Sequence, residues 1–183
     1  LIMKFVTLVE DTTKCELGAE HGLSIYAETE KHKLLFDVGT TDLFIKNAKA
    51  LGIDLSQVDT VVISHGHNDH GGGLDAFLAI NDHAVIYLQE KAFNDHYTAK
   101  KTGPEYIGLN QALKTHPQVK LLDGSYVIDD ELQIYSHVTG EIYETNKNLL
   151  KEDKTRDDFV HEQHLLFRAG RMCFLWAAVI KVC

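Results

Sequence analysis

The sequence contains few of the residues that break or crosslink a chain. Its 183 residues include two prolines and three cysteines, and Cys15, Cys173 and Cys183 show no paired spacing. There is no low-complexity run, so we expect no long disordered linker. An odd number of scattered cysteines favours a reducing compartment over a disulfide-stabilised secreted domain. We therefore expect a cytoplasmic protein with one globular core.

Long apolar runs and an excess of positive charge are also missing. No segment reaches the roughly 20 apolar residues that a membrane-spanning helix needs. The first residues, "LIMKFVTLVE", lack the basic start and small-residue cleavage site of a signal peptide. The formal net charge is -9, with acidic residues spread along the chain, which disfavours a phosphate-backbone partner. We expect neither a membrane nor a nucleic acid as partner. The expected substrate is a small molecule.

What the sequence does contain is a pattern of strands followed by amphipathic helices. Apolar residues at helical spacing follow Asp42 and stop at Gly52, and a continuous apolar run over Thr60–Ser64 is typical of a buried strand. Further expected elements are strands over Lys4–Val9, Leu23–Thr29, residues 31–39 and residues 84–88, a helix over Leu74–Ile80, and a hairpin over residues 125–136 that turns at Asp129 and Asp130. Strands that alternate with helices predict a layered α/β fold.

Three histidines and an aspartate lie within six residues of the stretch "SHGHNDHGGGL", directly after the strand that ends at Ser64. His65 and His67 are two apart, so an extended backbone projects both to one side. Asp69 and His70 follow, and imidazole and carboxylate groups are suitable ligands for zinc, with iron or manganese as alternatives. Three glycines then permit a tight turn. A histidine-rich surface loop is the alternative, but the full spacing at a strand end favours a metal site, and it has room for two ions.

These residues resemble a known family. "HGHNDH" matches the HxHxDH motif of the metallo-β-lactamase superfamily, a group of metal-dependent hydrolases with an αβ/βα sandwich fold. The segments "EHGLSIYAET", "LLFDVG" and "DDFVHEQ" are similar to the branch usually named for a dihydropterin ribofuranosylaminobenzene phosphate synthase. The resemblance extends from about Met3 to about Leu166. It implies that residues 1–166 form the N-terminal part of the sandwich.

The resemblance also assigns roles to residues. His65 and His67 match the ligands of the first metal, and Asp69 and His70 match those of the second. Asp69 would in addition help to orient the nucleophile, which makes it the expected catalytic residue. Asp37, in "FDVG", would lie near the metals and orient their ligands; a turn-capping aspartate is the alternative.

Other histidines have weaker assignments. His21, in the matched "EHGLS", is expected either to line the cleft or to belong to a structural loop. His161 matches a family position and is a candidate for the cleft, whereas His164 is expected to pack or to face solvent. His116 precedes Pro117 and is expected in a turn. Solvated or hydrogen-bonded roles are expected for His32, His83, His96 and His137.

The C-terminal part departs from the family pattern. Similar proteins continue into "GCSH" or "GCAH", whose histidine completes the first metal site, and a later histidine completes the second. This chain instead continues from residue 167 into an apolar tail that ends "GRMCFLWAAVIKVC". We hypothesise a frameshift between Leu166 and Met172, which would leave about two protein ligands for each ion.

Three interpretations remain open. The first is a hydrolase that acts on an ester, phosphoester or lactam-like bond of a small molecule. The second is an inactive metal-binding fragment of such an enzyme, and the third is a subunit completed by another chain. An incomplete second sheet would expose apolar surface, which predicts self-association into a homo-oligomer unless the tail covers that surface as an additional strand.

Overall fold

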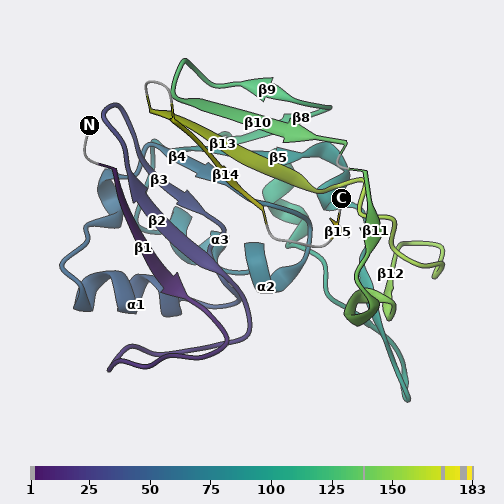
Figure 1. Cartoon of the computed structure of the whole chain (residues 1–183). Helices are drawn as coiled ribbons and strands as arrows, with labels where there is room; N and C mark the ends of the chain where they lie inside the picture. Colours follow the sequence, from purple (N-terminus) through teal and green to yellow (C-terminus); the bar gives the residue numbers. More distant parts are fainter. Residues whose placement is uncertain (1–2, 138, 170–171, 178–180, 183) are drawn as a thin grey trace.

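The computed structural model describes residues 3–137, 139–169, 172–177 and 181–182. Two β-sheets lie face to face, and the helices pack on the outer side of one of them (Figure 1). Two smaller sheets lie beside this sandwich at the end where the histidine motif is located. The strand-then-helix pattern of the sequence therefore folds into layers, as predicted.

The larger sheet has six strands. Their order is β1 (Lys4–Val9), β2 (Ser24–Glu28), β3 (Lys33–Phe36), β4 (Thr60–Val62), β5 (Val85–Gln89) and β8 (Val119–Leu122). The first three strands pair antiparallel, whereas β3, β4, β5 and β8 run parallel. Loops that follow parallel strands meet at one edge of a sheet, which is where ligands bind in open α/β sheets.

The second sheet has four strands, in the order β14 (Met172–Trp176), β13 (Gln163–Ala169), β10 (Leu132–Ser136) and β9 (Tyr126–Val127). β9 and β10 form the expected hairpin. The described part of the apolar tail forms β14, which pairs antiparallel with β13. Residues 170–171, 178–180 and 183 of the tail lie outside the described residues.

The remaining elements are short. β6 (Tyr97–Lys100), β7 (Gly103–Tyr106) and β12 (Leu149–Leu150) form a three-stranded sheet, and β11 (Glu141–Ile142) pairs with β15 (Lys181–Val182). The α-helices are α1 (Leu43–Ala50), α2 (Asn68–Gly71) and α3 (Leu74–Leu78). Single 3-10 turns cover Leu55–Gln57, Glu90–Phe93, Gln111–Thr115 and Glu144–Asn146.

The strands of the larger sheet are buried on both faces, because successive side chains point to opposite sides. Leu35 and Val61 belong to the core beneath the helices, which includes Phe44 of α1. Leu34 and Val62, one position away in each strand, belong to the core between the two sheets. This arrangement explains why these strands read as continuous apolar runs.

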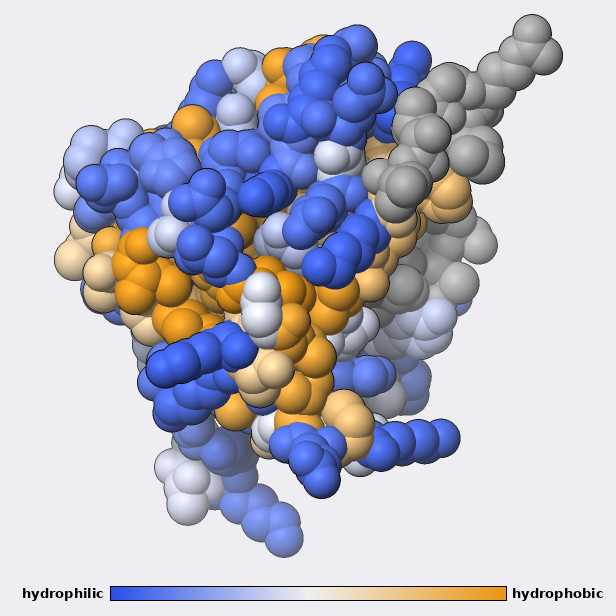
Figure 2. All heavy atoms as spheres, turned by 90° about the vertical axis from the view of Figure 1, so that its left-hand side faces the viewer, coloured by the Kyte–Doolittle hydropathy of each residue, from blue (hydrophilic) through white to orange (hydrophobic). Residues whose placement is uncertain are grey.

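The outer face of the four-stranded sheet has no such cover. Within the described residues, α1 and α3 pack on the six-stranded sheet, and no α-helix packs on the other one. Leu175 of β14 is exposed on this outer face. Phe174, one position away, pairs with the buried Phe167 and therefore points towards the six-stranded sheet. It is exposed at the sheet edge, where its ring centroid lies 6.2 Å from that of the exposed Phe5 of β1. Figure 2, which shows the side of the molecule where β1 and α1 lie, also has apolar side chains gathered near its centre. Self-association through such surface stays a prediction.

None of the described helices has the length and apolar character to cross a membrane.

His32 connects the two sheets and provides a first prediction. Its Nδ1 lies 2.7 Å from Asp59, just before β4, and its Nε2 lies 2.9 Å from Asp129 in the hairpin. The Asp59 hydrogen bond, together with Asp129, outweighs burial and raises the pKa of His32 to about 9. In the unfolded chain the pKa of His32 is about 6.5. Because the folded value is higher, the ion pairs of His32 stabilise the fold fully below about pH 6.5, and this stabilisation is lost as the pH rises through 9.

We expect the free energy of unfolding to fall by about 3 kcal/mol between pH 6 and pH 10 because of His32. His32→Gln should remove this component, and His83→Gln, at an exposed histidine beside Asp82, should keep it. Urea unfolding of the metal-free proteins at several pH values measures the difference. Parallel stability curves for the unsubstituted protein and His32→Gln would contradict the expectation.

Candidate metal centre

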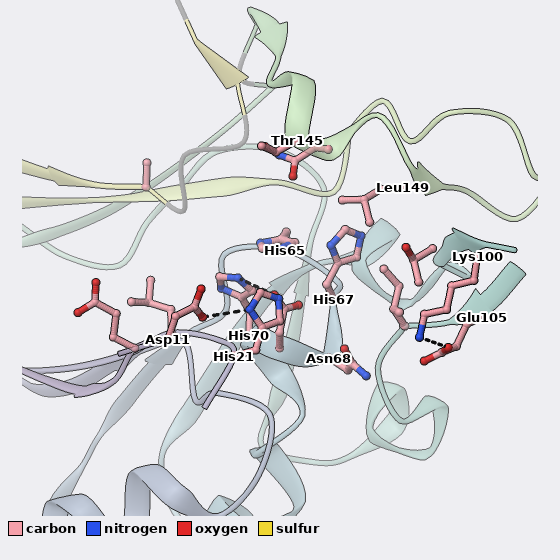
Figure 3. Close-up of a pocket in the computed structure, with 17 residues that line it drawn as sticks. Asp11, His21, His65, His67, Asn68, His70, Lys100, Glu105, Thr145 and Leu149 are labelled. Atoms are coloured by element: carbon pink, nitrogen blue, oxygen red, sulfur yellow. Dashed lines mark hydrogen bonds and ion pairs between the residues drawn. The ribbon is translucent and has the colours of Figure 1, made fainter. Parts of the chain in front are cut away.

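The histidine motif lies at the carboxyl ends of the parallel strands. β4 ends at Val62, the chain continues through His65 to His67, and α2 begins at Asn68. His65, His67, Asp69 and His70 all line one cavity of about 1000 Å³. Figure 3 shows that its walls come from this motif, from the β1–β2 loop and from β6 and β7. The structure therefore brings all four predicted ligands to a single cavity.

The glycine run allows the motif to pack closely against the segment that follows β3. A Cβ on Gly72 would lie 2.5 Å from the carbonyl oxygen of Thr40, and one on Gly73 would lie 2.4 Å from that of Val38. The amide of Val38 also donates to the carbonyl of His70 at 2.8 Å. Side chains at these glycines would push the motif away from β3, so the turn depends on their absence.

Asp37 lies fully buried directly beneath the motif, with a positive φ of 59°. Its carboxylate accepts hydrogen bonds from the amide and the hydroxyl of Ser64, both at 2.7 Å. It also accepts a hydrogen bond from Nδ1 of His70 at 2.7 Å. Because the Ser64 hydroxyl donates to Asp37, it accepts from Nδ1 of His65 at 2.8 Å. Asp37 thus orients two of the predicted ligands, one directly and one through Ser64.

These hydrogen bonds decide which ring nitrogen can bind a metal. Nδ1 of His65 and Nδ1 of His70 each donate, which leaves Nε2 of both rings as the possible ligand atom. Nε2 of His70 lies 3.3 Å from Oδ2 of Asp69. The potential ligand atoms of His65, Asp69 and His70 all lie within 4.8 Å of one another. Nitrogen and carboxylate oxygen at this separation suit a divalent transition metal.

His65 and His70 differ in their protonation state. Burial and the neighbouring imidazoles hold the pKa of His65 well below its usual range, so this ring is neutral at pH 7. Burial also opposes a charge on His70, but the carboxylates of Asp37 and Asp69 outweigh it and raise the pKa of His70 to about 10. A metal that binds Nε2 of His70 near pH 7 must therefore displace a proton.

The third histidine of the motif is oriented by a different carboxylate. Nε2 of His67 donates to Oδ2 of Asp157 at 3.2 Å, so Nδ1 is the nitrogen left for a metal. Nε2 of His161 also donates to Asp157, at 3.1 Å. Burial opposes the charge of Asp157, but these hydrogen bonds outweigh it and hold the pKa of that carboxyl well below its usual range. His96 completes this buried group, with Nδ1 3.3 Å from Asp157 and no hydrogen bond to either ring nitrogen.

Three imidazoles around one carboxylate also form a donor set of the kind that holds metal ions. The tautomer of His161 argues against that use. Its Nδ1 accepts the amide hydrogen of Gly66 at 2.9 Å, so the proton of the neutral ring is on Nε2, the atom that faces Asp157. A ring in this state has no free lone pair for an ion. We therefore interpret Asp157 as the group that orients His67, while His161 fixes the backbone between His65 and His67.

The structure shows which of the histidines with weaker assignments line the cavity. His161 is buried beside the motif, behind His67, and does not line the cavity. His21 does line it, at the rim. His164 packs beside Glu162, with Nε2 3.2 Å from that carboxylate. His96 was expected to be solvated or hydrogen-bonded, but it is buried and neither ring nitrogen has a hydrogen-bond partner, because it packs against the imidazoles around Asp157. Asp157 was not predicted from the sequence, although it lies in the matched segment "DDFVHEQ".

Comparisons with known proteins identify relatives over most of the chain. The model of the metallo-β-lactamase superfamily matches residues 17–163. An uncharacterized protein of Methanocaldococcus jannaschii is 28% identical, over 89% of this chain and 65% of the relative. The 7,8-dihydropterin-6-methyl-4-(β-D-ribofuranosyl)-aminobenzene-5'-phosphate synthase of the same organism is 30% identical, over 79% of this chain and 52% of the relative.

A solved structure has the same arrangement of elements. A metal-dependent hydrolase of the β-lactamase superfamily aligns with a TM-score of 0.73 and 27% identity, over 95% of this chain and 64% of that protein. The chain thus spans about half to two thirds of the length of the proteins that it matches.

Proposed function

Since the chain belongs to the metallo-β-lactamase superfamily, we propose that it is a metal-dependent hydrolase acting on an ester, phosphoester or lactam-like bond of a small molecule. One observation supports this most directly. Each of the three motif histidines has one nitrogen engaged by a buried partner, which leaves Nε2 of His65, Nδ1 of His67 and Nε2 of His70 as the possible ligand atoms. Such hydrogen-bonded partners are typical of metal-ligating histidines.

The residues present fit a divalent metal, with zinc favoured and iron or manganese as alternatives. His65 and His67 would hold one ion, and Asp69 and His70 a second. A bound metal of this kind supplies a water of lowered pKa and polarises the bond to be cleaved. Asp69 would help to orient the attacking water from its place beside His70. The cavity is lined by charged and polar groups such as Lys100, Glu105 and Asn68, which suits a polar small molecule.

Metal content tests this proposal. The purified full chain is expected to contain tightly held metal by elemental analysis and to hydrolyse a chromogenic ester, phosphodiester or lactam. Removal of the metal with a chelator should abolish turnover. It should also lower the free energy of unfolding by about 2.7 kcal/mol for each ion that was present at about 100 times its Kd. Addition of zinc, iron or manganese should restore both.

The two other interpretations give different results in the same experiment. An inactive fragment would bind metal weakly or fractionally and show no turnover with any of the three substrate types. A subunit completed by another chain would hold metal tightly only in an oligomer, so occupancy would follow protein concentration. A full chain that binds no divalent metal at all would contradict the proposal.

A further inference from the structure

The β1–β2 loop carries an imidazole to the rim of the metal centre. Nδ1 of His21 donates to Oδ1 of Asp11 at 3.0 Å. In the neutral ring the lone pair is then on Nε2, which lies 3.5 Å from Oδ2 of Asp69. Figure 3 shows His21 joined to Asp11 by a hydrogen bond at the end of the cavity where His70 also lies. His21 therefore has the same arrangement as His67 and His70, with one nitrogen bound to a carboxylate and the other left for a ligand.

The backbone around His21 is fixed against the motif itself. The amide of Leu23 donates to the carbonyl of Asp69 at 3.3 Å, and the hydroxyl of Thr40 donates to the carbonyl of His21 at 2.6 Å. The amide of Gly22 donates to the same Asp11 oxygen that holds the His21 ring, at 3.2 Å. The His21 side chain is 80% exposed. The backbone of residues 21–23 is nevertheless held in place by these three hydrogen bonds.

Gly22 is the residue that permits this contact. Its φ of +139° is rarely adopted by residues with side chains, and a Cβ at this position would lie 2.2 Å from the carbonyl oxygen of Asp69. A side chain at this position would therefore push the loop away from the metal-ligand segment.

We propose that His21 is the third protein ligand of the ion held by Asp69 and His70, an inference that rests on the proposed function. The distances from Oδ2 of Asp69 to Nε2 of His70 and to Nε2 of His21 are 3.3 and 3.5 Å. Ligands about 2.0 to 2.1 Å from a tetrahedral ion lie roughly 3.3 Å from one another. Two histidines and one aspartate leave a fourth position open for water or substrate, as in catalytic sites.

This ligand would come from the N-terminal part of the larger sheet, in the loop between β1 and β2. Asp11 acts as the outer carboxylate that orients it, in the way Asp37 orients His70.

Metal titration of the metal-free full chain tests the inference. His21→Ala is expected to weaken binding of one Zn²⁺ by at least about 100-fold, since loss of even an outer partner typically costs about 10- to 100-fold. The visible spectrum of the Co²⁺ protein should change at the same time, because one nitrogen ligand is lost. His83→Ala is the matched control: His83 is also an exposed imidazole beside a carboxylate, Asp82, but it lies outside the cavity.

Two further variants separate the possible outcomes. If His70→Ala loses one Zn²⁺ while His21→Ala binds as the unsubstituted protein does, the inference is wrong and the proposed function stands. If the unsubstituted protein binds no metal, both are wrong. Asp11→Asn should weaken the same Zn²⁺ less than His21→Ala does, and circular dichroism of each metal-free variant verifies that the fold is retained.

Discussion

His67→Ala is expected to abolish metal-dependent hydrolysis and to remove the metal that His65 and His67 share. The variant deletes the Nδ1 lone pair that the hydrogen bond to Asp157 leaves free. It also leaves the buried Asp157 with one imidazole donor fewer. Turnover of whichever ester, phosphodiester or lactam the protein cleaves should fall to the rate of the buffer, and one fewer ion per chain should be found by elemental analysis.

Asp157→Asn gives the intermediate case that distinguishes a ligand from the group that orients it. All ligand atoms remain, but the amide carries no negative charge and keeps one acceptor oxygen where the carboxylate has two. It cannot accept from the Phe159 amide at one oxygen and from both imidazoles at the other. Metal affinity should fall by about 10- to 100-fold, and nitrogen NMR shifts of the metal-free protein should show His67 losing its single tautomer. His164→Ala removes an imidazole–carboxylate pair outside the cavity and should leave metal content and turnover unchanged. Full activity of His67→Ala would reject the proposed centre.

That His65, His67, Asp69 and His70 lie together in one cavity could be predicted because the sequence signals are local. The apolar run before Ser64, the two-residue spacing of His65 and His67 and the glycines after His70 all lie within one short stretch. An apolar strand followed by polar side chains and a glycine turn is typical of a ligand-binding site at the carboxyl end of a strand. The same is true of the hairpin at Asp129, where turn residues separate two alternating runs.

The groups that orient the ligands could not be found in this way. Asp157 lies 90 residues after His67, and His96 reaches the same carboxylate from the segment before β6. His32 likewise bridges partners 27 and 97 residues away. Sequence spacing carries no information on such contacts, because tertiary packing creates them. The resemblance to a family indicated Asp37 and His21, but the hydrogen bonds that define their roles appear only in the folded structure.

Asp37→Asn is expected to destabilise the metal-free protein by about 3 to 5 kcal/mol, the usual cost of removing one member of a buried charged pair. The charged ring of His70 would then lack its closest counter-charge, although its burial is unchanged. Asparagine tolerates the positive φ of this residue better than most side chains do, so this substitution reports the loss of charge with little added backbone strain.

Three measurements on Asp37→Asn follow from that argument. Urea unfolding at pH 7 should show the loss of stability, and NMR titration should show a lower pKa for His70. Metal binding should weaken as well, because neither His65 nor His70 keeps its orientation once the carboxylate that holds Ser64 and His70 is gone. Asp37→Ala should lose more stability than Asp37→Asn, since alanine adds strain at this φ and removes the acceptor of the Ser64 amide. Asp82→Asn, at an exposed carboxylate beside an imidazole, is the control. If Asp37→Asn were as stable as Asp82→Asn, the buried carboxylate would not be what holds the predicted ligands in place.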